Sequence, residues 1–304
     1  DYPFYFSPFL LFHLIKDKPD VVVTEGEINF INNLSIYIYT KAFNKKYVWW
    51  SLGKVRTRKK NIINKILDPV VDYLLARSST IMARNTYAKD YYINVKGCEP
   101  KKVIVAPNSM NNHKVSTDVD DEVVKKLKLK KVGQVILYVG ALVVSKKPMD
   151  LLLAFSDLCK VNDELELWFV GDGDERFVLE QKALLLGIEN KVIFFGRIFK
   201  GVGSYFSACD MVVVPGLGGL VINHAMIYGK PVVSGLADGT EYDLIEEGVT
   251  GSIVKPGQEN LIKGISTVLK LTDSSVVEKA IARKISDEWN IDLMVSKTLE
   301  CIYR

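Results

Sequence analysis

Residues 211–226, MVVVPGLGGLVINHAM, place an apolar run directly before a glycine-rich turn and a helical pattern. The run from Met211 to Val214 predicts a buried parallel strand. The helical pattern starts near Leu220 and stops at Gly229. A strand, a glycine turn and a helix N-terminus together form an anion site, because free N–H groups and the helix dipole face the turn. For one isolated loop, a tight turn with structural glycines explains the pattern equally well.

The remaining sequence alternates between strand and helix patterns on both sides of a polar stretch, residues 110–130. Short apolar runs precede helical patterns across residues 20–108 and again across residues 135–271, which predicts βαβ units and two parallel sheets. We therefore predict an α/β fold with two Rossmann-like, doubly wound domains. The expected domains are residues 1–118 and 119–285, followed by a C-terminal helix, residues 286–304.

Three polar loops of the second half each follow a predicted strand and contain glycine. They are residues 140–147, 171–174 and 216–219. Doubly wound sheets bind ligands beyond the carboxyl ends of their strands, so these loops are expected on one ligand-binding edge. Because the three loops are expected at one edge, an anion site is better supported by the three together than by any one of them alone.

Composition and charge exclude several classes of protein. The 304 residues are 48% hydrophobic and 25% charged, as in globular domains. The four cysteines are scattered without a CxxC pair, which argues against a disulfide framework or a zinc site and fits a reducing compartment. No apolar run approaches a membrane span, and no signal peptide is evident.

Charge is divided unevenly along the chain. Residues 1–118 hold 18 Lys and Arg against 10 Asp and Glu, a net charge of about +8, and the remainder is about −4. The basic half is a candidate for contact with an anionic membrane or an anionic acceptor, and a solvated basic face explains it as well. Nucleic-acid binding is disfavoured because no recognition module is present.

The ordered motifs resemble those of a known enzyme family. They are Gly140-Ala141-Leu142 with Lys146, Gly171-Asp172-Gly173, Phe195-Gly196-Arg197, the loop 216–226, and Gly229-Lys230-Pro231. In this order the chain is similar to the retaining GT-B glycosyltransferases of family 4, the glycosyl transferases group 1, in a divergent bacterial polysaccharide-type branch. The resemblance implies two such domains facing a cleft, with the first domain truncated at its N-terminus. It also implies that the C-terminal helix crosses back to the first domain.

The resemblance also implies a set of site residues. Lys146 and His224 are the expected catalytic residues. The expected donor-binding residues are Gly140, Gly171, Gly173, Arg197, Gly216, Gly218, Gly219 and Leu220, and those on the acceptor side are Trp50, Ser51, Gly53 and Arg56. The donor is expected to be a nucleotide sugar linked to UDP or GDP, with no cofactor and no metal. Asp172-Gly173-Asp174 is interpreted as a turn, not as a metal motif.

The implied function is transfer of a hexose, with retention, to a glycan acceptor that we expect to be lipid-linked, in bacterial surface polysaccharide synthesis. We expect a cytoplasmic location, with peripheral contact to the inner face of the cytoplasmic membrane as an option.

Several positions depart from the family pattern. Gly216 and His224 stand where the family has two Glu, and Ala141 stands where it has Arg. An alternative is therefore a catalytically inactive protein of the same fold that binds nucleotide sugars or acts as a scaffold. An epimerase on the same plan ranks last, because it would need acid and base groups that this loop lacks.

Overall fold

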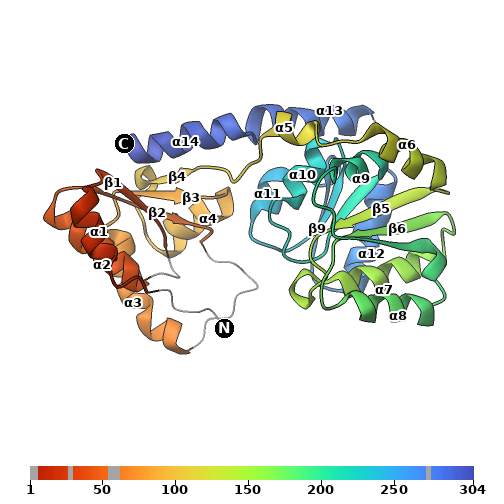
Figure 1. Ribbon diagram of the computed structural model, residues 1–304, viewed down its shortest axis with the longest axis horizontal. Helices are drawn as coiled ribbons and strands as arrows, with labels where there is room; N and C mark the ends of the chain where they lie inside the picture. The colour runs from red at the N-terminus through yellow and green to blue at the C-terminus, as the bar shows by residue number, and fades with distance from the viewer. Residues whose placement is uncertain (1–5, 27–29, 54–61, 272–274) are drawn as a thin grey trace. The chain divides into compact units, whose positions relative to one another are not determined.

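The computed structural model describes residues 6–26, 30–53, 62–271 and 275–304. It divides into two compact units, each built on one parallel sheet (Figure 1). The first unit comprises Asp1–Asn108 and Asp292–Arg304, and the second comprises Ser109–Ile291. Residues 109–118, which we expected in the first domain, group with the second unit. The C-terminal segment, Asp292–Arg304, groups with the first unit.

The sheet of the first unit has four parallel strands in the order β1-β2-β3-β4. The strands are Val21–Glu25 (β1), Lys46–Ser51 (β2), Thr80–Ala83 (β3) and Val103–Val105 (β4). Strands β2 and β3 are buried almost throughout, as their apolar runs predict for a parallel sheet with helices on both faces. In register, Trp50 of β2 pairs with Met82 of β3.

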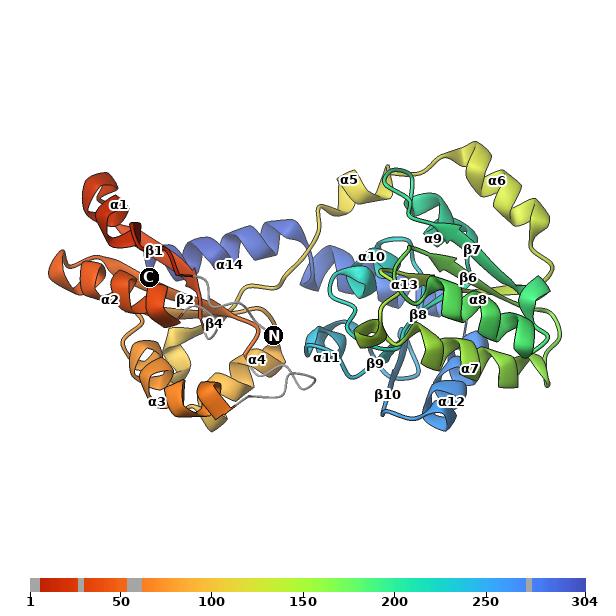
Figure 2. The ribbon, with the colours of Figure 1, turned by 60° about the horizontal axis from the view of Figure 1, so that its bottom comes forward.

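Helices cover both faces of this sheet (Figure 2). They are Leu10–Asp17 (α1), Phe30–Ala42 (α2), Ile62–Ala76 (α3), Thr86–Asp90 (α4) and Ile291–Tyr303 (α14). On one face, Trp49 and Leu74 are fully buried among side chains from α1 to α4. On the other face, Cys301 of α14 packs against Val48 and Met82. The C-terminal helix thus completes the core of the first unit.

The sheet of the second unit has six parallel strands in the order β10-β9-β8-β5-β6-β7. The strands are Gln134–Val139 (β5), Leu165–Val170 (β6), Val192–Gly196 (β7), Met211–Val214 (β8), Val232–Gly235 (β9) and Gly251–Val254 (β10). The strand order reverses at β5, which pairs with β6 on one side and β8 on the other. The loops that follow these two strands therefore flank the switch point at which such sheets bind ligands.

Two layers of helices enclose this sheet, which confirms the predicted doubly wound architecture. The helices of one face are Pro148–Cys159 (α7), Arg176–Leu185 (α8) and Gln258–Leu269 (α12). Those of the other face are Asp121–Lys130 (α6), Gly203–Ala208 (α9), Val221–Ile227 (α10), Thr240–Leu244 (α11) and Ser275–Arg283 (α13). Within the described residues, no helix has the length and apolarity that a membrane crossing requires.

The polar stretch 110–130, where we expect a linker because apolar periodicity is absent before Val123, contains two helices, Asn112–Ser116 (α5) and α6. The side chain of Asp120 caps α6, accepting hydrogen bonds from the N–H groups of Glu122 (3.0 Å) and Val123 (3.2 Å). Local capping therefore stabilises a helix whose apolar face is narrow: Leu127 is its one buried residue.

The predicted C-terminal helix, residues 286–304, is shorter in the structure. Helix α14 begins at Ile291, and Trp289 lies in a break with φ −143° before it. The carbonyl of Trp289 accepts a hydrogen bond from Ser109 Oγ (3.0 Å). This bond ties the two chain segments at the boundary of the second unit to each other.

We predict that Cys301→Asp destabilises the first unit by about 3 kcal/mol, because it buries a carboxylate without a partner. Tyr303→Asp is the control, since Tyr303 is 78% exposed, and we expect it to change stability by less than about 0.5 kcal/mol. Hydrogen exchange of the β2 and β3 amides measures both effects. Equal protection in the two variants would mean that α14 does not contribute to this core.

Candidate donor-binding edge of the six-stranded sheet

Loops that follow β5, β6, β7 and β8 meet at one edge of the second sheet through backbone hydrogen bonds. The bonds between loops are Gly140 N–H to Val170 O (3.0 Å), Leu142 N–H to Asp172 O (3.0 Å), Gly171 N–H to Gly196 O (2.8 Å) and Leu217 N–H to Ser145 O (3.5 Å). The structure therefore brings the three predicted glycine loops together, with the end of β7 beside them.

Glycines let these main chains touch. A β-carbon on Gly171 would lie 1.9 Å from the carbonyl oxygen of Gly140, and one on Gly173 would lie 2.5 Å from that of Leu142. Their φ angles are +145° and +159°, which side chains rarely tolerate. Any other residue at either position would force the loops apart.

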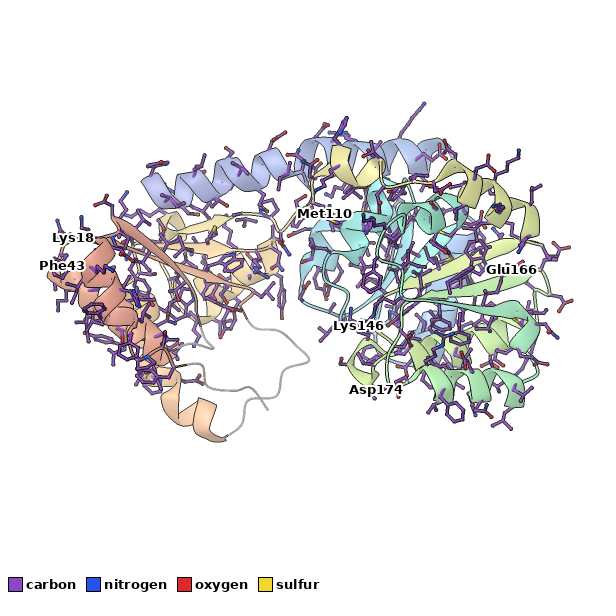
Figure 3. All side chains as sticks on the ribbon, viewed as in Figure 1. Lys18, Phe43, Met110, Lys146, Glu166 and Asp174 are labelled. Carbon is purple, nitrogen blue, oxygen red and sulfur yellow. The ribbon has the colours of Figure 1, made fainter. Side chains whose placement is uncertain are left out.

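Lys146 ends a short 3₁₀ turn, Val144–Lys146, on the loop after β5. Its ammonium nitrogen lies 3.3 Å from where a β-carbon of Gly140 would be, so the cation covers the backbone at the sheet edge. Figure 3 shows Lys146 and Asp174 on neighbouring loops of this edge. Lys146 is half-buried and has no salt bridge with another described residue, whereas Lys147 pairs with Asp150 (3.9 Å).

Gly216 lies against the Lys146 loop. A β-carbon at this position would be 2.7 Å from the carbonyl oxygen of Ser145 and 2.8 Å from the carbonyl carbon of Lys146. A glutamate, which the family pattern places here, would displace that loop. The glycine therefore allows the lysine-bearing loop to approach the turn after β8.

Helix α10 begins at Val221, close to the predicted start, and Leu220 precedes it. The N–H groups of Gly218, Gly219 and Leu220 donate to no acceptor among the residues that the structure describes. Gly219 has φ +57°, the left-handed conformation that a glycine turn requires. The turn thus presents several free donors at the edge that Lys146 covers.

His224 lies in an aromatic cluster on α10. Its ring centroid is 4.3 Å from that of Phe206 and 5.7 Å from that of Tyr228, and its Nε2 is buried without a hydrogen-bond partner among the described residues. Burial lowers the pKa of His224 to about 4. The imidazole is therefore neutral near pH 7, and its expected catalytic role stays a prediction.

Arginines occupy two different environments at the edge. Arg197 follows β7 and is exposed, so it is available to a ligand. Arg176, which sequence reasoning missed, reaches Asp172 (3.6 Å) and Glu180 (2.9 Å), and its guanidinium lies beside Gly196. It braces the loop after β6 against the end of β7. The i, i+4 spacings of Asp172, Arg176 and Glu180 were the available signal.

A second residue missed by sequence reasoning is Glu241, which is fully buried after β9. Its carboxylate accepts the N–H groups of Ala237 and Gly239, both at 2.9 Å. Burial raises the pKa of Glu241, and these two hydrogen bonds oppose that shift. Its contacts indicate that it fixes the loop after β9.

The predicted acceptor-side residues lie in the first unit. Trp50 and Ser51 end β2, and Ser51 Oγ accepts the N–H of Gly53 (2.9 Å), which has φ +66°. The guanidinium carbon of Arg84 is 3.8 Å from the ring centroid of Trp50. Arg56 lies outside the described residues.

Within the described ranges, His, Cys, Asp and Glu side chains form no group of three that could hold a metal ion; metal independence stays a prediction.

Comparisons with known proteins agree with this geometry. The family model described as Glycosyl transferases group 1 matches residues 119–284, a little more than half of the chain. An uncharacterised glycosyltransferase of Methanocaldococcus jannaschii is 30% identical over 141 residues, 45% of this chain and 36% of that protein. The lipopolysaccharide 1,6-galactosyltransferase of Salmonella typhimurium is 27% identical over 202 residues, 61% of this chain and 49% of that protein. The chain spans about half or less of the length of these two relatives.

Solved structures show the same fold. HepE of Anabaena in complex with UDP matches with a TM-score of 0.80 at 21% identity, covering 98% of this chain and 82% of HepE. The lipopolysaccharide outer core galactosyltransferase WaaB matches with a TM-score of 0.71 at 18% identity, covering 96% of this chain and 77% of WaaB. These likenesses confirm the predicted GT-B arrangement of two Rossmann-like domains with parallel sheets.

We predict that Gly171→Ala destabilises the second unit by at least about 2 kcal/mol more than Gly187→Ala does. Both glycines have positive φ, but a β-carbon on Gly187 meets nothing within 4 Å. The difference therefore reports the contact between the loops together with the greater backbone strain at φ +145° than at φ +68°. Urea unfolding of both variants measures it, and equal destabilisation would show that the close approach at Gly171 is not required.

We predict that stability falls as pH drops from about 6.5 to about 4, in part because His224 must protonate. The pKa of His224 is about 4 in the folded protein and near 6.5 in the unfolded chain. The contribution of the neutral imidazole to the free energy of unfolding is therefore complete above pH 6.5. At most about 3 kcal/mol of it is lost as the pH falls from 6.5 to about 4. His224→Phe should flatten the dependence, and His113→Gln, at an exposed position, should leave it unchanged. Identical unfolding profiles for His224→Phe and the parent protein would contradict the assignment.

Proposed function

Because the chain belongs to the glycosyl transferases group 1 family, we propose that it transfers a hexose from a nucleotide sugar to a glycan acceptor, with retention. The observation that supports this most strongly is the half-buried Lys146, a cation without a salt bridge to a described residue. It lies at the edge where the donors of Gly218 and Gly219 are free. A cation beside free N–H groups suits a diphosphate better than it suits any neutral ligand.

The proposed reaction depends on stabilising the leaving nucleoside diphosphate. As the bond between the sugar and the diphosphate breaks, negative charge grows on the phosphate oxygens. Lys146 and the N–H groups of Gly218, Gly219 and Leu220 would bind that charge more strongly in the transition state than in the ground state. The acceptor hydroxyl then bonds to the anomeric carbon on the same face and gives its proton to the departing phosphate. No protein nucleophile is required.

The donor is proposed to be linked to UDP or GDP. HepE, whose fold this chain shares, has been solved with UDP, which favours uracil as the first base to test. Arg197 is exposed after β7 and would contact the base or a phosphate. No cofactor takes part in the proposed reaction.

The acceptor is proposed to be a lipid-linked glycan of a bacterial surface polysaccharide, bound by the first unit near Trp50, Ser51 and Gly53. Peripheral contact with the inner face of the cytoplasmic membrane would bring the protein to such an acceptor. Two observations support it: the net charge of about +8 over residues 1–118 and the exposed aromatic side chains Phe9 (69%) and Phe12 (63%) beside α1 and on it.

A nucleotide-sugar-binding protein without catalysis is the second candidate. It is favoured by Gly216 and His224, which replace the two carboxylates of the family pattern. Calorimetry with UDP- and GDP-sugars alongside a turnover assay separates the candidates. Turnover supports the transferase, and donor binding without turnover supports the binding protein.

We predict that Lys146→Ala lowers kcat/KM for transfer at least about a hundredfold, because it removes the full positive charge proposed to stabilise the leaving diphosphate. Lys147→Asn is the matched control: it removes the adjacent charge at a residue with φ +54°, which Asn tolerates, and should retain most activity. Circular dichroism verifies folding of both variants. Full activity of folded Lys146→Ala would refute the site.

A further inference from the structure

Helix α8 of the second unit presents apolar side chains on the side that faces solvent. Its buried residues, Leu179 and Ala183, lie on the opposite side. The exposed apolar residues and their exposed fractions are Phe177 (69%), Val178 (51%), Leu184 (58%) and Leu185 (80%). A surface helix ordinarily has polar residues on the side away from its core, and a helix that is apolar all round is ordinarily buried. The sequence of α8 therefore suits a helix that is covered on both sides.

The exposed side of α8 belongs to the outer surface of its helix layer. Figure 1 shows α8 at the margin of the second unit. Strand β7, which follows it, is the edge strand of the six-stranded sheet. Within its layer α8 packs against α7, and α7 packs against α12. Another molecule therefore has access to the exposed side of α8.

The apolar residues of this side are arranged symmetrically about Gln181, which is exposed at its centre. They lie three and four positions before Gln181, and three and four positions after it. At 3.6 residues per turn, Phe177 and Leu184 lie on one flank of Gln181. Val178 and Leu185 lie on the other flank. The pattern is therefore the same when the helix is turned end for end.

Such a pattern is complementary to itself in an antiparallel pair of helices. A two-fold axis at Gln181 would place Phe177 of one copy against Leu184 of the second copy. The same axis would place Val178 against Leu185. Each contact then occurs twice, as symmetric dimer interfaces require. The carboxamide of Gln181 both donates and accepts hydrogen bonds, so it can pair with its own copy at the axis.

Charge and area also favour a second copy as the occupant. On α8, Arg176 pairs with Glu180 (2.9 Å), and Lys182 is the one cation without an ion pair to a described residue. Recognition of anionic lipid uses clusters of about four to eight cations, so this helix is poorly suited to a membrane surface. Two copies of the apolar residues and Gln181 would bury on the order of 1,000 Å², the lower limit for a specific interface. That area fits a reversible dimer.

We propose that a second copy of this chain covers the exposed side of α8, in a symmetric dimer whose two-fold axis passes at Gln181. The proposal goes beyond the proposed function and does not depend on it, because none of the residues in this interface is assigned to the donor or the acceptor.

Sedimentation velocity of the full chain, at concentrations up to about 200 μM, tests the proposal through mass action. We expect a monomer–dimer equilibrium with a Kd of about 1–100 μM, given the small area. Leu185→Glu should weaken the dimer at least about tenfold, because it places a charge in the apolar contact. Leu129→Glu is the matched control: Leu129 is 77% exposed on α6, on the other face of the sheet. It should leave the Kd unchanged.

A charge-pairing experiment tests the position of the axis. Gln181→Lys and Gln181→Glu should each weaken self-association, because like charges then meet at the axis. An equimolar mixture of the two variants should form a heterodimer with at least the parent affinity. Circular dichroism verifies that every variant is folded.

Three results would overturn the proposal. One is a folded parent protein that stays monomeric up to about 200 μM. Another is a dimer that Leu185→Glu leaves intact, or that Leu129→Glu weakens equally. The third is a mixture of Gln181→Lys and Gln181→Glu that associates no better than either variant alone, since Gln181 would then not face its own copy. Flotation with vesicles of anionic lipid checks the other occupant: a monomer that floats, and that Leu185→Glu releases, would assign this side of α8 to a membrane instead.

Discussion

The second unit depends on the close approach of two main chains, at Gly171 and Gly140. A β-carbon on Gly171 would lie 1.9 Å from the carbonyl oxygen of Gly140, so the loops after β5 and β6 can meet only because one of them has no side chain. Their contact places Lys146 over the edge of the sheet. The turn after β8 then closes on the same loop at Gly216, again through a missing side chain. Together, these contacts bring backbone donors and the Lys146 cation to the switch point of the sheet.

Two of the departures from the family pattern, at positions 216 and 224, have a structural explanation. Position 216 lies 2.7 Å, at its β-carbon, from Ser145 O, so a carboxylate there would displace the lysine-bearing loop. Position 224 packs against Phe206 and Tyr228, and its imidazole is neutral near pH 7. Where the family pattern has two carboxylates, this chain has a closer backbone contact and a neutral aromatic cluster. The proposed chemistry accordingly relies on Lys146 and on backbone donors.

Most of the fold could be predicted from the sequence, because buried parallel strands and amphipathic helices leave direct patterns, and the shared edge of the three glycine loops follows from strand direction alone. Helices α5 and α6 were not predicted as such, since local capping stabilises them more than periodicity does. Asn111 caps α5, and Asp120 caps α6, whose buried residue is Leu127. The burial of His224 depends on aromatic side chains elsewhere in the chain, which spacing does not reveal. Glu241 was missed because its partners are backbone N–H groups of a loop, which leave no side-chain pattern in the sequence.

The central claim is that the turn from Gly216 to Leu220 binds the diphosphate of a nucleotide sugar. Hydrogen–deuterium exchange of the backbone amides, with and without UDP or GDP, tests it most directly, because the N–H groups of Gly218, Gly219 and Leu220 have no acceptor within the described structure. We predict slower exchange in the peptide that covers residues 216–222 when one of the nucleotides is added. Unchanged exchange there with a nucleotide that demonstrably binds, and protection at another part of the chain, would contradict the claim.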